Sequence, residues 1–177
     1  MTNEQIRQEI AEMIPFRYME RFELLWTMII PKYERLTADQ IKQQQEMENE
    51  REMFWSALED VTCSVLGIPS QALYSTTRKR EIVTARQIIF FLVRPCYLLS
   101  LKNVGDRYKK DHATILHGIN QASAQVEWDR QYRANVERIC YLLNEIGYAK
   151  PTIFFNKFVE HIEYKKELAL KKKSKIK

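Results

Sequence analysis

A stretch in the middle of the chain, KKDHATILHG at residues 109–118, gathers side chains that could do chemistry. It offers a carboxylate (Asp111), two imidazoles (His112 and His117) and a hydroxyl (Thr114) directly behind two lysines. The histidines are five residues apart, which puts them about 140° apart around a helix and makes them poor partners for one metal ion. No Ser/His/Asp arrangement, glycine-rich loop or carboxylate pair in an apolar setting accompanies them. The stretch therefore indicates contact with a ligand rather than catalysis or metal binding.

The position of these residues at the start of a helix suits contact with a polyanion. Asp111 is a favoured N-cap, and the helix behind it opens with free backbone N–H groups and the positive end of its dipole. Lys109 and Lys110 stand beside that end. Such a surface suits phosphate groups and the base edges behind them. The first turn holds the other candidates, His112, Ala113 and Thr114.

Two helices separated by the lysine pair must position this turn. The segment SLKNVGDRY at residues 100–108 starts with Ser100 as an N-cap and places Leu101, Val104 and Tyr108 on one face. Two helices joined by so short a turn, the second capped by an aspartate, predict a helix-turn-helix. The inward stripe of the second helix is expected to be Ile115, Ile119, Ala122 and Val126.

A basic stretch and a core helix precede this pair. TTRKREIVT at residues 76–84 lacks helical periodicity and reads as a loop. ARQIIFFLVRPCYLL at residues 85–99 is apolar enough for a core helix, whose end Pro95 leaves open. The cationic residues of the loop are Arg78, Lys79 and Arg80.

Helical patterns also dominate the rest of the chain. TADQ at residues 37–40 reads as a capping box that starts a helix running to Gly67. Upstream, residues 3–30 carry apolar positions at helical spacing, with Pro15 and Pro31 as breaks or kinks. Two further helices are predicted, one over residues 129–147 that Gly147 closes, and one that Pro151 opens, that packs on the core and that runs into a lysine-rich tail.

Composition limits the fold class. A chain of 177 residues that is 45% hydrophobic can bury a sizeable core, and only 4 glycines and 5 prolines argue against a turn-rich β fold. We therefore expect an all-α helical bundle. Its expected parts are an acidic N-terminal helical extension (residues 1–56), a helix-turn-helix domain (57–147) and an amphipathic helix with a basic tail (148–177).

The charge is divided along the chain. Residues 1–60 carry 7 basic and 13 acidic side chains, residues 61–125 carry 9 and 3, and residues 165–177 carry 7 and 1. This asymmetry predicts a polyanionic partner for the middle and the tail, with the acidic N-terminal part kept away from it.

Cysteine usage and hydropathy indicate the compartment. Cys63, Cys96 and Cys140 are far apart and embedded in apolar helical patterns, so we expect small buried hydrophobes in a reducing compartment. The N-terminus lacks the layout of a signal peptide, and no apolar run approaches the roughly 20 residues needed to cross a bilayer. The expectation is a cytoplasmic protein without membrane contact or cofactor.

Several of these motifs together resemble the C-terminal DNA-binding domain (domain IV, a Trp-repressor-like helix-turn-helix) of the bacterial chromosomal replication initiator DnaA. Arg86 and Gln87 form the Arg-Gln pair of that family. SLKNVGDRY is similar to its Ser-Leu-x-x-Ile-Gly-x-x-Phe, and DHATILH to its Asp-His-Thr-Thr-Val-Leu-His. The resemblance covers roughly residues 57–146, and Arg78 to Arg80 lie where the family keeps its basic loop.

The resemblance implies binding of double-stranded DNA at DnaA-box-like sites. It implies that Arg78 enters the minor groove, with Lys79 and Arg80 nearby, and that Arg86 and Gln87 hold the phosphate backbone. The major-groove role falls on Asp111, His112, Ala113 and Thr114, and Lys109, Lys110 and His117 complete the expected DNA-binding set.

Three departures from the family pattern qualify this expectation. Ala113 replaces a threonine and keeps only a methyl group that can touch thymine. Lys109 and Lys110 stand where the family has Gly-Gly-Arg, so the turn is one residue shorter. The sequence contains no G-x-x-x-x-G-K-[ST] loop, so we expect neither nucleotide binding nor the family's ATPase activity.

Two functions follow from these observations. One is non-enzymatic, sequence-specific DNA binding in replication initiation or its regulation. The alternative is a protein-interaction module that keeps the DnaA-like fold, binds a partner through its acidic N-terminal helices and retains only non-specific or vestigial DNA binding. The two differ in whether Arg78, Arg86, Lys109, Lys110 and His112 share one open surface.

Overall fold

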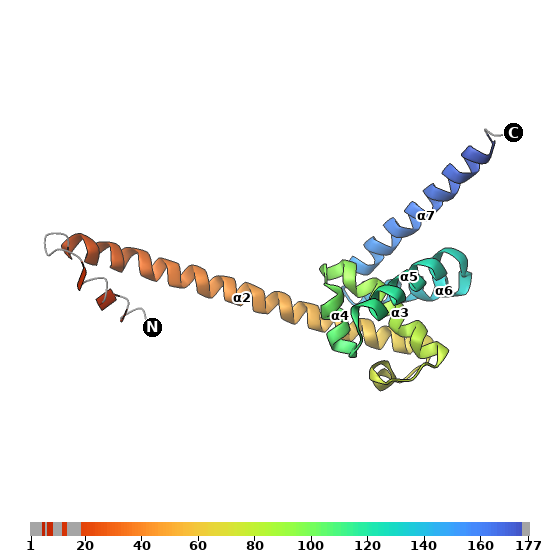
Figure 1. Cartoon of the computed structure of the whole chain (residues 1–177), viewed down its shortest axis with the longest axis horizontal. Coiled ribbons are helices and arrows are strands. Elements are labelled where there is room, and N and C mark those ends of the chain that lie inside the picture. Colours follow the sequence, from red (N-terminus) through yellow and green to blue (C-terminus); the bar gives the residue numbers. More distant parts are fainter. Residues whose placement is uncertain (1–4, 6, 9–11, 14–18, 175–177) are drawn as a thin grey trace. The chain divides into compact units, whose positions relative to one another are not determined.

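The structure is a computed structural model that describes residues 5, 7–8, 12–13 and 19–174. In this part of the chain all regular structure is helical, which confirms the predicted all-α class, and no helix in it is long and apolar enough to cross a membrane (Figure 1). The chain divides into two compact units, Met1–Glu50 and Arg51–Lys177. The elements are α2 (Met19–Leu66), the 3-10 helix η2 (Ser70–Tyr74), α3 (Arg80–Tyr97), α4 (Leu101–Tyr108), α5 (His112–Trp128), α6 (Arg130–Glu145) and α7 (Lys150–Ser174).

Helix α2 runs without a break from Met19 to Leu66, which corrects two expectations. The TADQ segment continues this helix instead of starting one, and Pro31 does not end it. A threonine caps a helix only where the backbone before it is not helical, and the residues on both sides of Pro31 and TADQ are mostly good helix formers. The predicted end is confirmed, because Gly67 follows with φ 65°. Ile6, Ile10, Ile14 and Pro15 lie outside the described residues.

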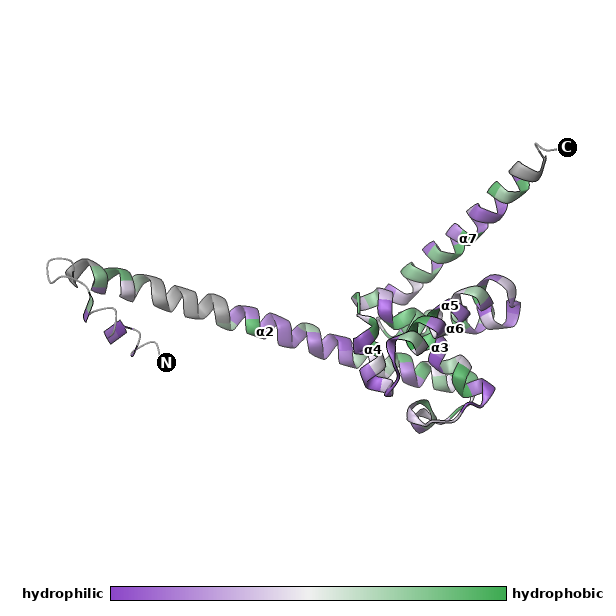
Figure 2. Cartoon of the chain, viewed as in Figure 1, coloured by the Kyte–Doolittle hydropathy of each residue, from purple (hydrophilic) through white to green (hydrophobic). Residues whose placement is uncertain are grey.

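In the unit Met1–Glu50, no side chain of the described residues is buried. Phe22 and Trp26 pack one turn apart with ring centroids 5.6 Å from each other, and Arg7 pairs with Glu23 at 2.5 Å. From residue 38 to residue 50 every side chain is exposed, and Figure 2 shows this stretch of α2 as mainly hydrophilic. This stretch of α2 is therefore exposed to solvent on every face.

The unit Arg51–Lys177 has its core around α3, which packs against α5, α7 and η2. The end of α2 contributes the buried Phe54, Trp55 and Leu58. Helices α4 and α6 pack against α5, and α6 also packs against α7. The largest fully buried side chains include Leu73, Ile88, Ile89, Leu92, Val104, Ile115, Ile139 and Leu143.

Helix α3 starts earlier than its sequence pattern predicts. It begins at Arg80, so only residues 75–79 form the loop, whereas the whole basic stretch 76–84 was expected to be non-helical. Ile82 and Ala85 are buried and lie three residues apart, so the first turns of α3 have an inward apolar face. In the sequence, the charged neighbours make this helical pattern hard to recognise. At the other end α3 passes through Pro95 and stops at Tyr97, where Leu98 takes the left-handed conformation.

Helices α4 and α5 form the predicted helix-turn-helix, and both predicted caps are confirmed. Ser100 Oγ accepts a hydrogen bond from the Asn103 backbone N–H at 3.1 Å. Asp111 Oδ1 accepts one from the Thr114 backbone N–H at 2.6 Å. Gly105 lets the two helices approach, because a Cβ at this position would lie 2.4 Å from the carbonyl oxygen of Lys110.

The two C-terminal helices pack against each other, and they also pack on the core, α6 against α5 and α7 against α3. Helix α6 ends before Gly147, which has φ 98°. Helix α7 packs on the core through Phe155 and Ile162, as predicted, while every side chain from residue 163 to residue 171 is exposed. Cys63, Cys96 and Cys140 are free thiols, and burial raises the pKa of Cys140 to about 12.

Candidate nucleic-acid interface

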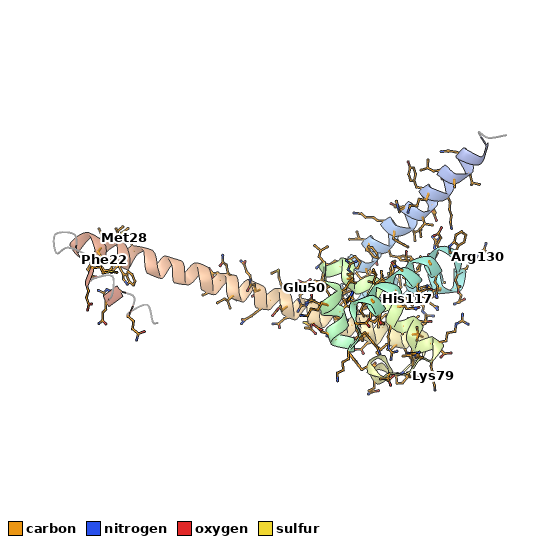
Figure 3. The ribbon with its side chains drawn as sticks, viewed as in Figure 1. Phe22, Met28, Glu50, Lys79, His117 and Arg130 are labelled. Carbon is orange, nitrogen blue, oxygen red and sulfur yellow. The ribbon has the colours of Figure 1, made fainter. Side chains whose placement is uncertain are left out.

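A short cationic loop connects η2 to α3. Its residues Arg78 and Lys79, together with Arg80 at the first position of α3, are all exposed. In Figure 3 Lys79 marks this loop and His117 marks the neighbouring helix α5. None of the three cations has a partner among the ion pairs of the described residues. They are therefore available to a ligand.

Arg86, on α3, is hydrogen-bonded to the backbone of η2 and of this loop. Its side chain is 6% exposed, and its guanidinium donates to the backbone carbonyls of Leu73 at 2.8 Å and Thr77 at 2.8 Å. It also donates to the carbonyls of Ala72 at 2.9 Å and of Ser75. Burial lowers the pKa of Arg86. These partners differ from the phosphate that the resemblance implies for Arg86. The guanidinium shapes the loop by donating to its backbone carbonyls.

The N-terminal turn of α5 is open to solvent. Asp111, His112, Ala113 and Thr114 are all exposed, and Lys109, in the left-handed conformation with φ 52°, is exposed beside them. The backbone hydrogen bond from Thr114 lowers the pKa of Asp111, so this carboxylate stays ionised as a cap. Because Asp111 accepts from the helix, the positive end of the dipole is partly satisfied, and the neighbouring lysines keep the tip cationic.

A groove of about 500 Å³ joins the loop to α5. Arg78 lines it from the loop and Gln87 from α3, while Lys110 and His117 line it from the turn and from α5. No acidic residue is among its lining residues. The full lining is Thr76, Thr77, Arg78, Val83, Arg86, Gln87, Phe90, Lys110, Thr114, His117 and Gly118.

Close packing of α5 on α3 sets the width of this groove. A Cβ at Gly118 would lie 3.0 Å from the ring of Phe90 and 3.7 Å from the side chain of Gln87. Glycine at this position lets the two helix backbones approach, which brings the α5 tip beside the loop. Sequence reasoning did not single out Gly118, Phe90 or Thr77, because their importance depends on which helices meet.

The predicted site residues thus fall into three groups. Arg78, Gln87, Lys110, Thr114 and His117 line the groove. Lys79, Arg80, Lys109, Asp111, His112 and Ala113 are exposed on the same loop, helix start and turn but do not line it. Arg86 also borders the groove, but its side chain is buried in the loop. In the described part of the chain no group of histidine, cysteine and acidic residues could hold a metal ion.

The two capped helices, their short turn and the exposed start of the second helix define a helix-turn-helix domain. Residues 56–122 match the family described as bacterial dnaA protein helix-turn-helix, and this segment belongs to that family. The match confirms the resemblance found in the motifs.

Curated relatives agree with this assignment. The chain is 35% identical over 99 residues to the chromosomal replication initiator protein DnaA of Synechococcus sp. (strain JA-2-3B'a(2-13)), which covers 53% of this chain and 21% of the relative. It is 34% identical over 87 residues to the protein of the same name in Bacteroides fragilis, covering 49% and 18%. The match therefore spans about a fifth of the length of these relatives.

Proposed function

We propose that residues 51–177 bind double-stranded DNA, with the cationic loop in the minor groove and the start of α5 in the adjacent major groove. The observation that supports this most is the continuous groove between Arg78 and the Lys110–His117 segment, which has cationic walls and no acidic residue. A loop beside the start of a helix can enter the minor groove while the helix start enters the adjacent major groove.

The proposed roles follow the geometry. Arg78, exposed on the loop, reads the width and A·T content of the minor groove. Gln87, Lys110 and His117, in the groove between the two elements, contact phosphate. Arg86 acts indirectly, because its donors already hold the loop. Major-groove contacts fall to the exposed residues Asp111, His112, Ala113 and Thr114, and further phosphate contacts to Lys79, Arg80 and Lys109.

The relatives suggest the biological setting. They are chromosomal replication initiators, so we propose that this chain binds DnaA-box-like sequences in replication initiation or its regulation, without catalysis. Lys109 and Lys110 shorten the turn by one residue relative to the family pattern, so we expect a different tilt of the recognition helix and a shifted preferred box.

Titration of labelled duplexes tests the proposal. Wild type should prefer a TTATCCACA-like box to a scrambled duplex, and affinity should fall steeply as salt rises because each neutralised phosphate releases counterions. Arg78→Ala and His112→Ala should each cost about 1–3 kcal/mol of binding to the box. Arg138→Ala serves as the matched control, because Arg138 is exposed on α6 and outside the groove. Equal affinity of wild type for box and scramble would contradict sequence-specific binding.

A second candidate function is protein interaction through the N-terminal unit. Leu24, Leu25 and Met28 are 55–65% exposed within an acidic segment, a combination that suits a protein partner better than DNA. Comparing DNA binding by the whole chain and by residues 51–177 separates the two functions. If the N-terminal unit acts only through a partner protein, both should bind the box equally.

A further inference from the structure

A buried carboxylate lies behind the candidate interface. Glu59, on α2, is 6% exposed. It accepts hydrogen bonds from Tyr74 Oη on η2 at 2.7 Å and from Tyr108 Oη on α4. Arg107, also on α4, donates to both of its oxygens, from Nε at 3.1 Å and from Nη2 at 3.2 Å. One side chain thus ties three elements together.

The groups around Glu59 are themselves fixed. Trp55 Nε1 donates to Tyr108 Oη at 2.9 Å, and the Arg107 guanidinium lies 4.7 Å from the centroid of the Trp55 ring. Arg107 Nη1 also pairs with Glu52 at 2.6 Å. Burial and the charge of Glu59 raise the pKa of Tyr108 well above its ordinary value, so this hydroxyl remains a donor. A satisfied buried network of this kind holds one geometry.

The network contacts the residues that directly precede the cationic loop and the Lys109-Lys110 turn. Tyr74 is the last residue of η2 and directly precedes the cationic loop. Arg107 and Tyr108 are the last residues of α4 and directly precede the Lys109-Lys110 turn. The carboxylate of Glu59 lies between them and bonds to both.

We propose that Glu59 is a positioning residue that sets the distance between the cationic loop and the helix-turn-helix, and thereby the groove geometry that the protein selects. This inference rests on the proposed DNA-binding function. Glu59 does not touch DNA itself, because it is buried and its charge would repel phosphate. Its action is separate from that of Arg86, which shapes the loop internally, whereas Tyr74 and Glu59 anchor the loop to α4.

The substitution Tyr74→Phe tests this link with little risk to the fold. It removes only the hydroxyl that bonds to Glu59 and keeps the ring, which stacks on Tyr108 with centroids 5.6 Å apart. Tyr74 is 46% exposed, so the change leaves no cavity. Tyr141→Phe is the matched control, because Tyr141 is an exposed tyrosine on α6. Glu59→Gln is the second variant and leaves Arg107 paired with Glu52.

Double-mutant cycles measure whether Glu59 acts through the loop. The preference for box over scrambled duplex is determined for Arg78→Ala and for His112→Ala, each in wild type and in Tyr74→Phe. We expect the loss caused by Arg78→Ala to shrink at least about threefold in Tyr74→Phe, and the loss caused by His112→Ala to stay within about twofold. An unchanged Arg78→Ala loss, or equal shrinkage of both losses, would overturn the proposal.

A readout without DNA separates this inference from the proposed function. Hydrogen exchange at Arg86 Nε–H and at the Ser75 backbone amide, which bond to Leu73 and Ala72, should be about tenfold faster in Tyr74→Phe and unchanged in Tyr141→Phe. Unchanged exchange in Tyr74→Phe would overturn the anchoring role. A wild type without preference for the box would instead overturn the proposed function, and the exchange result would still decide whether the loop is anchored.

Discussion

At the scale of single residues, the buried guanidinium of Arg86 holds the loop of the candidate interface. The family resemblance implies that Arg86 holds the phosphate backbone, and that contact stays a prediction. Its observed partners are carbonyls 9 to 14 residues earlier in the chain. Which carbonyls turn towards an arginine depends on how η2 folds back onto α3, and no local pattern contains that information. The exposed candidates Arg78 and His112, by contrast, were predictable because surface cations need no tertiary partner.

Replacing Arg86 tests this role directly. Arg86→Lys keeps the charge but cannot supply the several fixed N–H donors that the loop carbonyls accept. We expect a loss of about 1–3 kcal/mol in the free energy of unfolding, measured by urea denaturation, because buried carbonyls lose their donors. The preference for box DNA should fall as in Arg78→Ala. Wild-type stability in Arg86→Lys would contradict the role, and Arg94→Lys, at an exposed arginine of the same helix, is the control.

At the scale of elements, two close contacts that glycine makes possible position the helices of the helix-turn-helix. Gly105 admits the carbonyl of Lys110, and Gly118 admits the ring of Phe90. The first contact is with backbone, which moves only if the turn deforms, and the second is with a side chain that can shift. The two sites should therefore differ in how they tolerate a methyl group.

Alanine at each glycine tests that difference. Gly105→Ala should lower the free energy of unfolding by about 1–3 kcal/mol, because the added Cβ would lie 2.4 Å from the Lys110 oxygen and the turn must deform. Gly118→Ala should cost less, because the Phe90 ring can shift by a few tenths of an ångström. Thermal unfolding followed by circular dichroism gives both values. A larger loss for Gly118→Ala would contradict this account of the turn.

Much of the element pattern was predictable because its signals are local. Ser100 and Asp111 were identified as caps from their residue types, and both make the expected bonds. The start of α3 and the continuity of α2 were not predictable in this way. At Arg80 the helix is stabilised by the burial of Ile82 and Ala85 in the core, and through Pro31 it is continued by flanking helix formers, so a local breaker signal was overridden.

At the scale of the whole molecule, the compact unit that carries the candidate interface extends beyond the helix-turn-helix. Phe54 and Trp55, near the end of α2, are 1% and 3% exposed, and Phe155 of α7 is 2% exposed. The helices on both sides of residues 57–147 thus supply core side chains. A fragment limited to these residues would expose the core faces that α2 and α7 cover.

Truncation tests this extension of the core. Residues 51–177 should unfold cooperatively, whereas residues 57–147 should be much less stable or unfolded. Each large buried side chain that is removed costs about 1.5–3 kcal/mol of transfer free energy, a large fraction of the stability of a small domain. Circular dichroism melting of the two fragments measures the difference. Equal melting temperatures would contradict the contribution of α2 and α7 to the core.

The hydrogen bonds from Arg86 to the loop have a consequence for recognition. A segment that is already ordered in the free protein has little conformational entropy left to lose when it docks. Arg78, carried by this ordered loop, should then favour duplexes whose minor groove already has the width that its side chain fits. Duplexes whose minor groove would have to deform should bind less tightly.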